Sequence, residues 1–130
     1  MPDLFDILTT DIEQTSNIDI ATDHPDWTPV ANLVTPTRAS GTYRIDIAVI
    51  WSLDTTTKSG MIRYSIDGGA TWKEFQSEPK DKTNDNGNDF GFTLIGTAEQ
   101  AWDIQVEMTK ESGTATMTCS SCEISLRRVG

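Results

Sequence analysis

The sequence predicts an all-β protein: a single antiparallel β-sandwich or jelly roll of seven or eight strands. From residue 41 onward, apolar and polar residues alternate with a period of two, as they do in strands with one buried face. Turn residues interrupt this alternation roughly every 8–14 residues, a spacing typical of sandwiches. The 19 threonines support the same fold, because β-branched residues suit a pleated surface. A chain of 130 residues has the length of one domain.

Residues 41–54 give the clearest strand pattern. Its predicted buried face consists of Tyr43, Ile45, Ile47, Val49 and Trp51. A second strand near residues 62–66 ends at Asp67-Gly68-Gly69. Because Asp-Gly and Gly-Gly supply the positive φ angles of tight hairpin turns, residues 71–75 are expected to run back as its partner.

Three more strands are predicted in the C-terminal part, after a polar loop at residues 78–89. Their inward residues are Phe90, Phe92 and Leu94, then Trp102, Ile104, Val106 and Met108, then Ala115, Met117 and Cys119. Beyond Cys119 the apolar face continues at Cys122, Ile124 and Leu126, which changes the parity. One extra residue explains this, so we expect a β-bulge at Ser120-Ser121. The C-x-x-C motif is then two inward thiols rather than a zinc or redox motif.

Residues 1–37 differ from the rest of the chain, because they contain seven of its 20 acids and no Lys or Arg. Three prolines keep the later part of this segment extended. We therefore expect an acidic extended arm over residues 1–37 and a sandwich domain over residues 38–130. The arm either lies across its own domain or docks on a neighbouring subunit. Its candidate interface residues, apart from Trp27, are Leu4, Phe5, Ile7 and Leu8.

The net charge of −10 argues against binding to nucleic acid or to an anionic membrane, since both demand clustered Lys and Arg. No apolar run approaches the roughly 18 residues of a membrane span. The N-terminal stretch also lacks the basic region and apolar core of a signal peptide, so none is expected.

The segment from Ser65 to Trp72 matches the pattern S-x-D-x-G-x-T-W, and thereby resembles the Asp-box of sialidases and other β-propellers. The resemblance implies a structural turn formed by Ser65, Asp67, Gly69, Thr71 and Trp72. In those families the box stabilises a hairpin away from the active site. A propeller of four or more blades does not fit 130 residues, so sialidase activity is not expected.

No constellation of catalytic or metal-binding residues is evident, so we expect no enzyme activity, no catalytic residue, no cofactor and no metal. His24 is the one imidazole and has no placed nucleophile beside it. Residues 81–89 resemble a calcium loop superficially, but Lys82 and Thr93 stand where that motif needs acids. A pair of carboxylates for glycoside hydrolysis stays open, since the chain has 20 acids.

Four tryptophans are candidates for a binding role. Trp51, Trp72 and Trp102 lie in strand patterns with apolar or turn-packing neighbours, so we expect them in the core. Trp27 lies outside any alternating run, between Asp26 and Thr28. It is therefore the candidate for an exposed anchor at an interface or ligand site.

Residues 47–81, IAVIWSLDTTTKSGMIRYSIDGGATWKEFQSEPKD, resemble small structural proteins of tailed bacteriophages, chiefly short-tailed ones. Those chains also join a hydrophobic strand, S-L-D-x-T-T-K-S, an R-[YF]-S-x-D-G-G-x-T-W hairpin and an E-P-K-D exit. The resemblance implies a non-enzymatic β-sandwich that decorates or cements the capsid exterior by binding the major capsid protein, after assembly in the host cytoplasm.

Two other interpretations stay open: a head–tail or tail accessory protein, and a carbohydrate-binding β-sandwich module. A homo-oligomer is expected in the virion case, with a trimer favoured by analogy, because several copies engaging at once add avidity.

Overall fold

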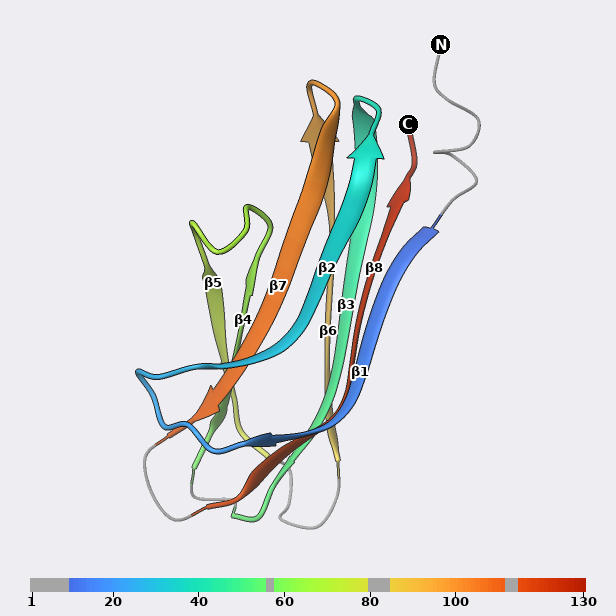
Figure 1. Ribbon diagram of the computed structural model, residues 1–130. Helices are drawn as coiled ribbons and strands as arrows, with labels where there is room; N and C mark the ends of the chain where they lie inside the picture. The colour runs from blue at the N-terminus through green and yellow to red at the C-terminus, as the bar shows by residue number, and fades with distance from the viewer. Residues whose placement is uncertain (1–9, 56–57, 80–84, 112–114) are drawn as a thin grey trace.

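The computed structural model describes residues 10–55, 58–79, 85–111 and 115–130, which form eight strands in two packed sheets (Figure 1). The strands are β1 (Thr10–Ile20), β2 (Thr28–Arg38), β3 (Gly41–Leu53), β4 (Gly60–Ser65), β5 (Lys73–Ser77), β6 (Asn86–Gly96), β7 (Gln100–Lys110) and β8 (Met117–Arg128). In the described ranges, no helix is long and apolar enough to cross a membrane.

The strand order is that of a jelly roll. One sheet runs β1-β8-β3-β6 and the other β2-β7-β4-β5, and all the pairings between named strands are antiparallel. Apart from β4 and β5, consecutive strands cross from one sheet to the other, so each sheet is built from segments far apart in sequence. The predicted fold class, an all-β antiparallel sandwich of seven or eight strands, is confirmed.

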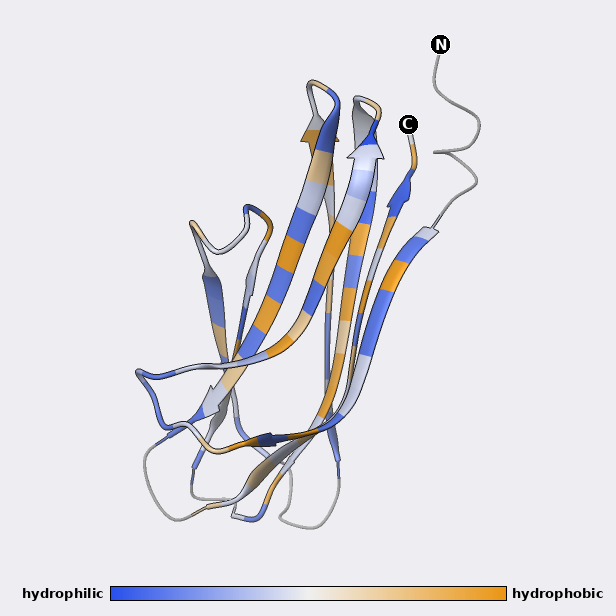
Figure 2. Ribbon diagram, in the orientation of Figure 1, coloured by the Kyte–Doolittle hydropathy of each residue, from blue (hydrophilic) through white to orange (hydrophobic). Residues whose placement is uncertain are grey.

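The core fills the space between the two sheets. Figure 2 shows the alternation of hydrophobic and hydrophilic residues along β3 and β7. All five residues predicted to face inward on β3 are buried, as are Trp102, Ile104, Val106 and Met108 of β7. The three predicted inward residues of β6 are half-buried, because β6 is an edge strand of its sheet. They are Phe90, Phe92 and Leu94.

The predicted β-bulge in β8 is present. Ile50 of β3 pairs with Ser121, and the next residue, Trp51, pairs with Cys119, so Ser120 is the extra residue. The bulge turns both Cys119 and Cys122 inward, where they are free thiols with no exposed surface. Burial in this apolar setting raises the pKa of Cys119 to about 11 and that of Cys122 to about 12.

We expect both thiols to be inert in the native protein. At about pH 8, fewer than roughly one in a thousand of either thiol is in the reactive thiolate form. Mass spectrometry after treatment with iodoacetamide should show no adduct on the folded chain and two adducts in urea. An adduct formed without unfolding would contradict the burial of these residues. The raised pKa values also predict a folded state that loses stability as the pH rises above about 9, where unfolded thiols ionise first.

The structure corrects the expected boundary between an arm at residues 1–37 and a domain at 38–130. Residues 10–38 supply β1 and β2, which pair with β8 and β7 and belong to the sandwich itself. Ile20, Val30 and Leu33 are buried in the common core. Residues 1–9, with the candidate interface residues Leu4, Phe5, Ile7 and Leu8, lie outside the described residues.

Candidate functional site

The loop that joins β1 to β2 folds over the outer face of the β2-β7-β4-β5 sheet. The backbone N–H of His24 donates to the carbonyl oxygen of Lys110 (2.8 Å), and the hydroxyl of Thr109 donates to the carbonyl oxygen of Thr22 (3.0 Å). The ammonium group of Lys110, which is buried, pairs with the carboxylate of Asp23. These contacts fix the loop on the end of β7.

Trp27, at the end of this loop, stacks on an arginine. The Cζ atom of Arg63, on β4, lies 4.5 Å from the centroid of the Trp27 ring and 4.1 Å from that of Trp72. Oε1 of Glu107, on β7, accepts hydrogen bonds from Nε and Nη2 of Arg63 at 2.8 and 2.5 Å. Cation–π contact and the ion pair together hold the Trp27 ring in one orientation.

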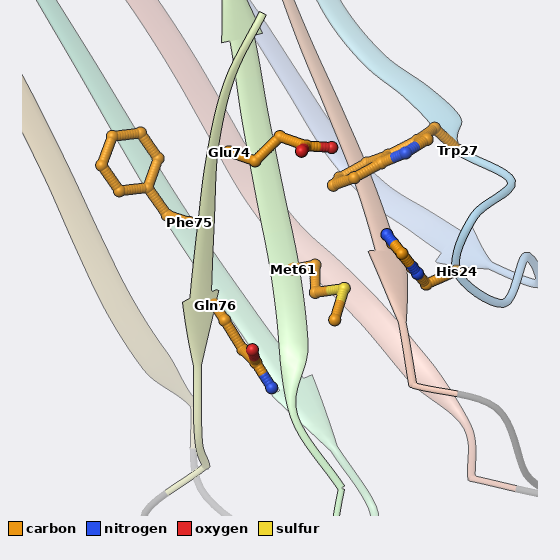
Figure 3. A pocket seen from close by; sticks show the side chains of 6 residues that line it. All are labelled: His24, Trp27, Met61, Glu74, Phe75 and Gln76. Carbon is orange, nitrogen blue, oxygen red and sulfur yellow. The ribbon is translucent and has the colours of Figure 1, made fainter.

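A cavity of about 320 Å³ opens beside Trp27. It is lined by His24, Trp27, Met61, Glu74, Phe75 and Gln76 (Figure 3). Glu74 and Gln76 point the same way from β5, and in Figure 3 the Glu74 carboxylate is directed toward the indole. The rings of His24 and Trp27 meet edge to face, with their centroids 6.1 Å apart. An aromatic face, a thioether and three polar side chains thus surround one small, open pocket.

The hairpin from β4 to β5 is fixed by hydrogen bonds around Asp67. The Ser65 hydroxyl donates to Oδ1 of Asp67 (2.7 Å), and the backbone N–H of Thr71 donates to the same oxygen (2.9 Å). The Thr71 hydroxyl donates to Oδ2 (2.5 Å), and the backbone N–H of Gly69 donates to the Ser65 hydroxyl (2.8 Å). Gly68 and Gly69 adopt φ angles of 70° and 94°, which favour glycine.

These donors, the Thr71 and Ser65 hydroxyls first among them, lower the pKa of Asp67 to about 2. Because this pKa is lower than the ordinary value of 3.8, the ionised carboxylate stabilises the folded state at pH values above 3.8. This stabilisation is lost as the pH falls toward about 2. We therefore expect Asp67→Asn to flatten the acid limb of the stability curve between about pH 4 and pH 2. Urea titrations across this range measure the slope, with Asp85→Asn as a matched control. Equal slopes in both variants would contradict the assignment.

The other tryptophans occupy two kinds of position. Trp51 and Trp102 are buried, as predicted, whereas Trp72 is half-buried and covers Arg63 instead of entering the core. The reason is that Trp72 precedes β5 and lies on the outer side of its sheet. Among the described residues, no cluster of three or more His, Cys, Asp or Glu could hold a metal ion.

A cluster of aromatic side chains fills the open side of the sandwich between the edge strands β5 and β6. Tyr64 stacks on Phe92 with centroids 5.1 Å apart, and Phe75 contacts Phe90 at 4.5 Å. Burial raises the pKa of the Tyr64 hydroxyl. We assign this cluster to the stability of the fold, because Tyr64, Phe90 and Phe92 pack on the main core, while Phe75, at 38% exposure, covers them from β5.

Neither the protein-family models nor the curated proteins contain a match to this sequence. Solved structures do match in fold. The VP2 subviral particle of infectious bursal disease virus aligns with a TM-score of 0.60 and 10% identity, over 93% of this chain and 33% of that one. The structure of the Gt strain of the same virus aligns with a TM-score of 0.58 and 8% identity, over 90% of this chain and 31% of that one. The crystal structure of FLHE aligns with a TM-score of 0.51 and 11% identity, over 93% of this chain and 97% of that one.

These likenesses show the fold. The chain spans about a third of the length of the viral chains that it matches, and identities near 10% carry no information about the site.

Proposed function

We propose that the chain is a non-enzymatic structural protein of a tailed-bacteriophage virion, a decoration or cement protein bound to the major capsid protein on the capsid exterior. The observation that carries this proposal is the placement of the phage-like segment, residues 47–81. It includes the end of β3 and all of β4 and β5, so the resemblance lies in the framework of a jelly roll. The fold likeness to a viral particle protein supports the same function.

The side of the sandwich formed by β1 and β2 is the best-suited attachment surface. Arg38 and Asp11 join these strands through an ion pair at 2.7 Å. Two large apolar side chains remain outside the core here, on the outer faces of different sheets: Ile12, at 56% exposure, pairs with Ser125 of β8, and Val34, at 60%, pairs with Asp103 of β7. The apolar residues of segment 1–9 directly precede β1 in sequence. This edge of the sandwich therefore exposes an apolar side chain on each of its two faces, on a chain whose net charge of −10 disfavours contact with packaged DNA.

Reconstitution tests the proposal. Purified full-length chain is added to capsids that lack it, and the bound copies are counted. Binding in a number set by the capsid lattice is expected, with a loss of roughly tenfold or more in affinity for a chain without residues 1–9 or for Ile12→Ser/Val34→Ser. Ile95→Ser, at a still more exposed position on β6 (76%), serves as the control and should bind normally.

Two outcomes would overturn the capsid role. If purified virions lack the chain, it is not a structural component. If the copy number instead matches a single head–tail junction, the accessory interpretation replaces the decoration protein. A trimer, which the same proposal favours by analogy, is checked by light scattering on the unbound chain.

A further inference from the structure

We propose that the cavity beside Trp27 is a binding site for a neutral pyranose sugar. This activity goes beyond attachment to a capsid and can be measured on the isolated chain. It rests on three features of the site: a fixed aromatic platform, paired hydrogen-bonding side chains, and a charge arrangement that disfavours anions.

The platform is the Trp27 ring. Arg63 covers the ring, is itself held by Glu107, and does not line the cavity. In Figure 3, Met61 and His24 lie on one side of the indole, and the His24 ring meets the indole edge to face with centroids 6.1 Å apart, so a ligand on this side would bind beside His24. An indole ring that is already fixed loses little conformational freedom when a ligand binds. A flat, fixed aromatic ring is also the surface on which the C–H face of a pyranose stacks.

Hydrogen bonding comes from the strand opposite. Glu74 and Gln76 are two residues apart on β5, so both side chains project from the same outer face. Their carboxylate and amide groups provide two kinds of acceptor and one kind of donor, which matches the adjacent hydroxyls of a sugar. The Gln76 amide also lies 3.4 Å from Oε1 of Glu111, which orients it. A cavity of about 320 Å³ is at the lower end of the usual range for small-ligand pockets.

The charges favour a neutral ligand over an anion. Among the described residues no Lys or Arg lines the cavity, and Glu74 together with a net charge of −10 repels anions such as phosphate. The Glu74 carboxylate would attract a cation, and the Arg63 guanidinium beside the ring is already paired with Glu107, so choline is the probe that separates a cation from a neutral sugar. A neutral polyol avoids the repulsion that an anion meets.

The experiment measures binding on the full-length chain with three classes of probe. The methyl α- and β-pyranosides of glucose, galactose and mannose represent neutral sugars, choline represents cations, and inorganic phosphate represents anions. Proton–nitrogen spectra follow the indole N–H signals. We expect at least one pyranoside to shift the Trp27 signal with millimolar affinity, and not those of the buried Trp51 and Trp102. Choline and phosphate should have no effect.

Matched variants assign the site. Trp27→Ala should weaken binding of the active pyranoside roughly tenfold or more, and Gln76→Ala several-fold. Glu74→Gln keeps an acceptor and should change affinity less than about threefold, because a neutral ligand does not need the charge. Asn32→Ala, an exposed amide on the same sheet, is the control.

The proposal is overturned if no pyranoside shifts the Trp27 signal, if Trp27→Ala binds as well as the wild type, or if choline binds and Glu74→Gln abolishes that binding. None of these results bears on capsid attachment, since the capsid is absent from the assay.

Discussion

A chain that begins at Arg38 is expected to be unable to fold, whereas a chain that begins at Thr10 is expected to fold normally. The longer deletion removes β1 and β2, and with them the buried side chains of Ile20, Val30 and Leu33. Burial of each such side chain stabilises a protein by about 1.5–3 kcal/mol, compared with about 5–15 kcal/mol for a whole domain. The deletion also leaves β8 and β7 as unpaired edges of their sheets.

Urea denaturation followed by near-ultraviolet circular dichroism distinguishes the two truncations. The chain that begins at Thr10 should show a cooperative transition with the denaturant slope of the full-length protein, because that slope scales with the surface exposed on unfolding. The chain that begins at Arg38 should show no transition and should aggregate. A cooperative transition in the shorter chain would instead restore the interpretation of residues 1–37 as a dispensable arm.

The sequence reveals the central strands far better than the edge strands. On β3 both neighbours are strands and one face is fully buried, so every second residue from Tyr43 to Leu53, six in all, is apolar and buried. On β1 both Ile12 and Glu13 are exposed, and the edge position requires few apolar side chains. β2 contains Pro29 and Pro36, which read as breaks in a strand although an edge strand tolerates them. Edge strands therefore resemble an extended linker in composition.

The candidate site could be predicted from sequence only in part. Trp27 can be identified from the sequence because it lies outside every alternating run of apolar residues. The residues that line the cavity with it come from a loop and two strands, which only the folded chain brings together. Arg63 and Glu107 both occupy positions that the alternation predicts to face outward, so the sequence indicates that both side chains lie on the surface of the sheet. Their pairing depends on the register of β4 against β7, in which these two residues are direct neighbours. Alternation alone does not fix a register between strands 44 residues apart.

Replacement of Trp51 by alanine is expected to cost about 3–5 kcal/mol of stability, the usual range for a fully buried aromatic side chain. Trp51 has no exposed surface, and its indole packs on Gly60, where an added Cβ would come within 2.9 Å of the ring. Its N–H donates to Oδ1 of Asn88 at 2.7 Å, which ties β3 to the edge strand β6. A loss of this size removes much of the stability of a domain with a typical 5–15 kcal/mol.

The phenylalanine variants separate the hydrogen bond from the packing. Trp102 is also buried, but its indole nitrogen has no hydrogen-bond partner among the described residues. Trp51→Phe loses both ring volume and a hydrogen bond, whereas Trp102→Phe loses ring volume and removes an unpaired donor, whose burial costs about 1–3 kcal/mol. Urea denaturation should therefore show Trp51→Phe to be the less stable variant by about 1–3 kcal/mol. Equal losses would mean that the hydrogen bond to Asn88 adds nothing to the backbone pairing and side-chain packing that hold β6.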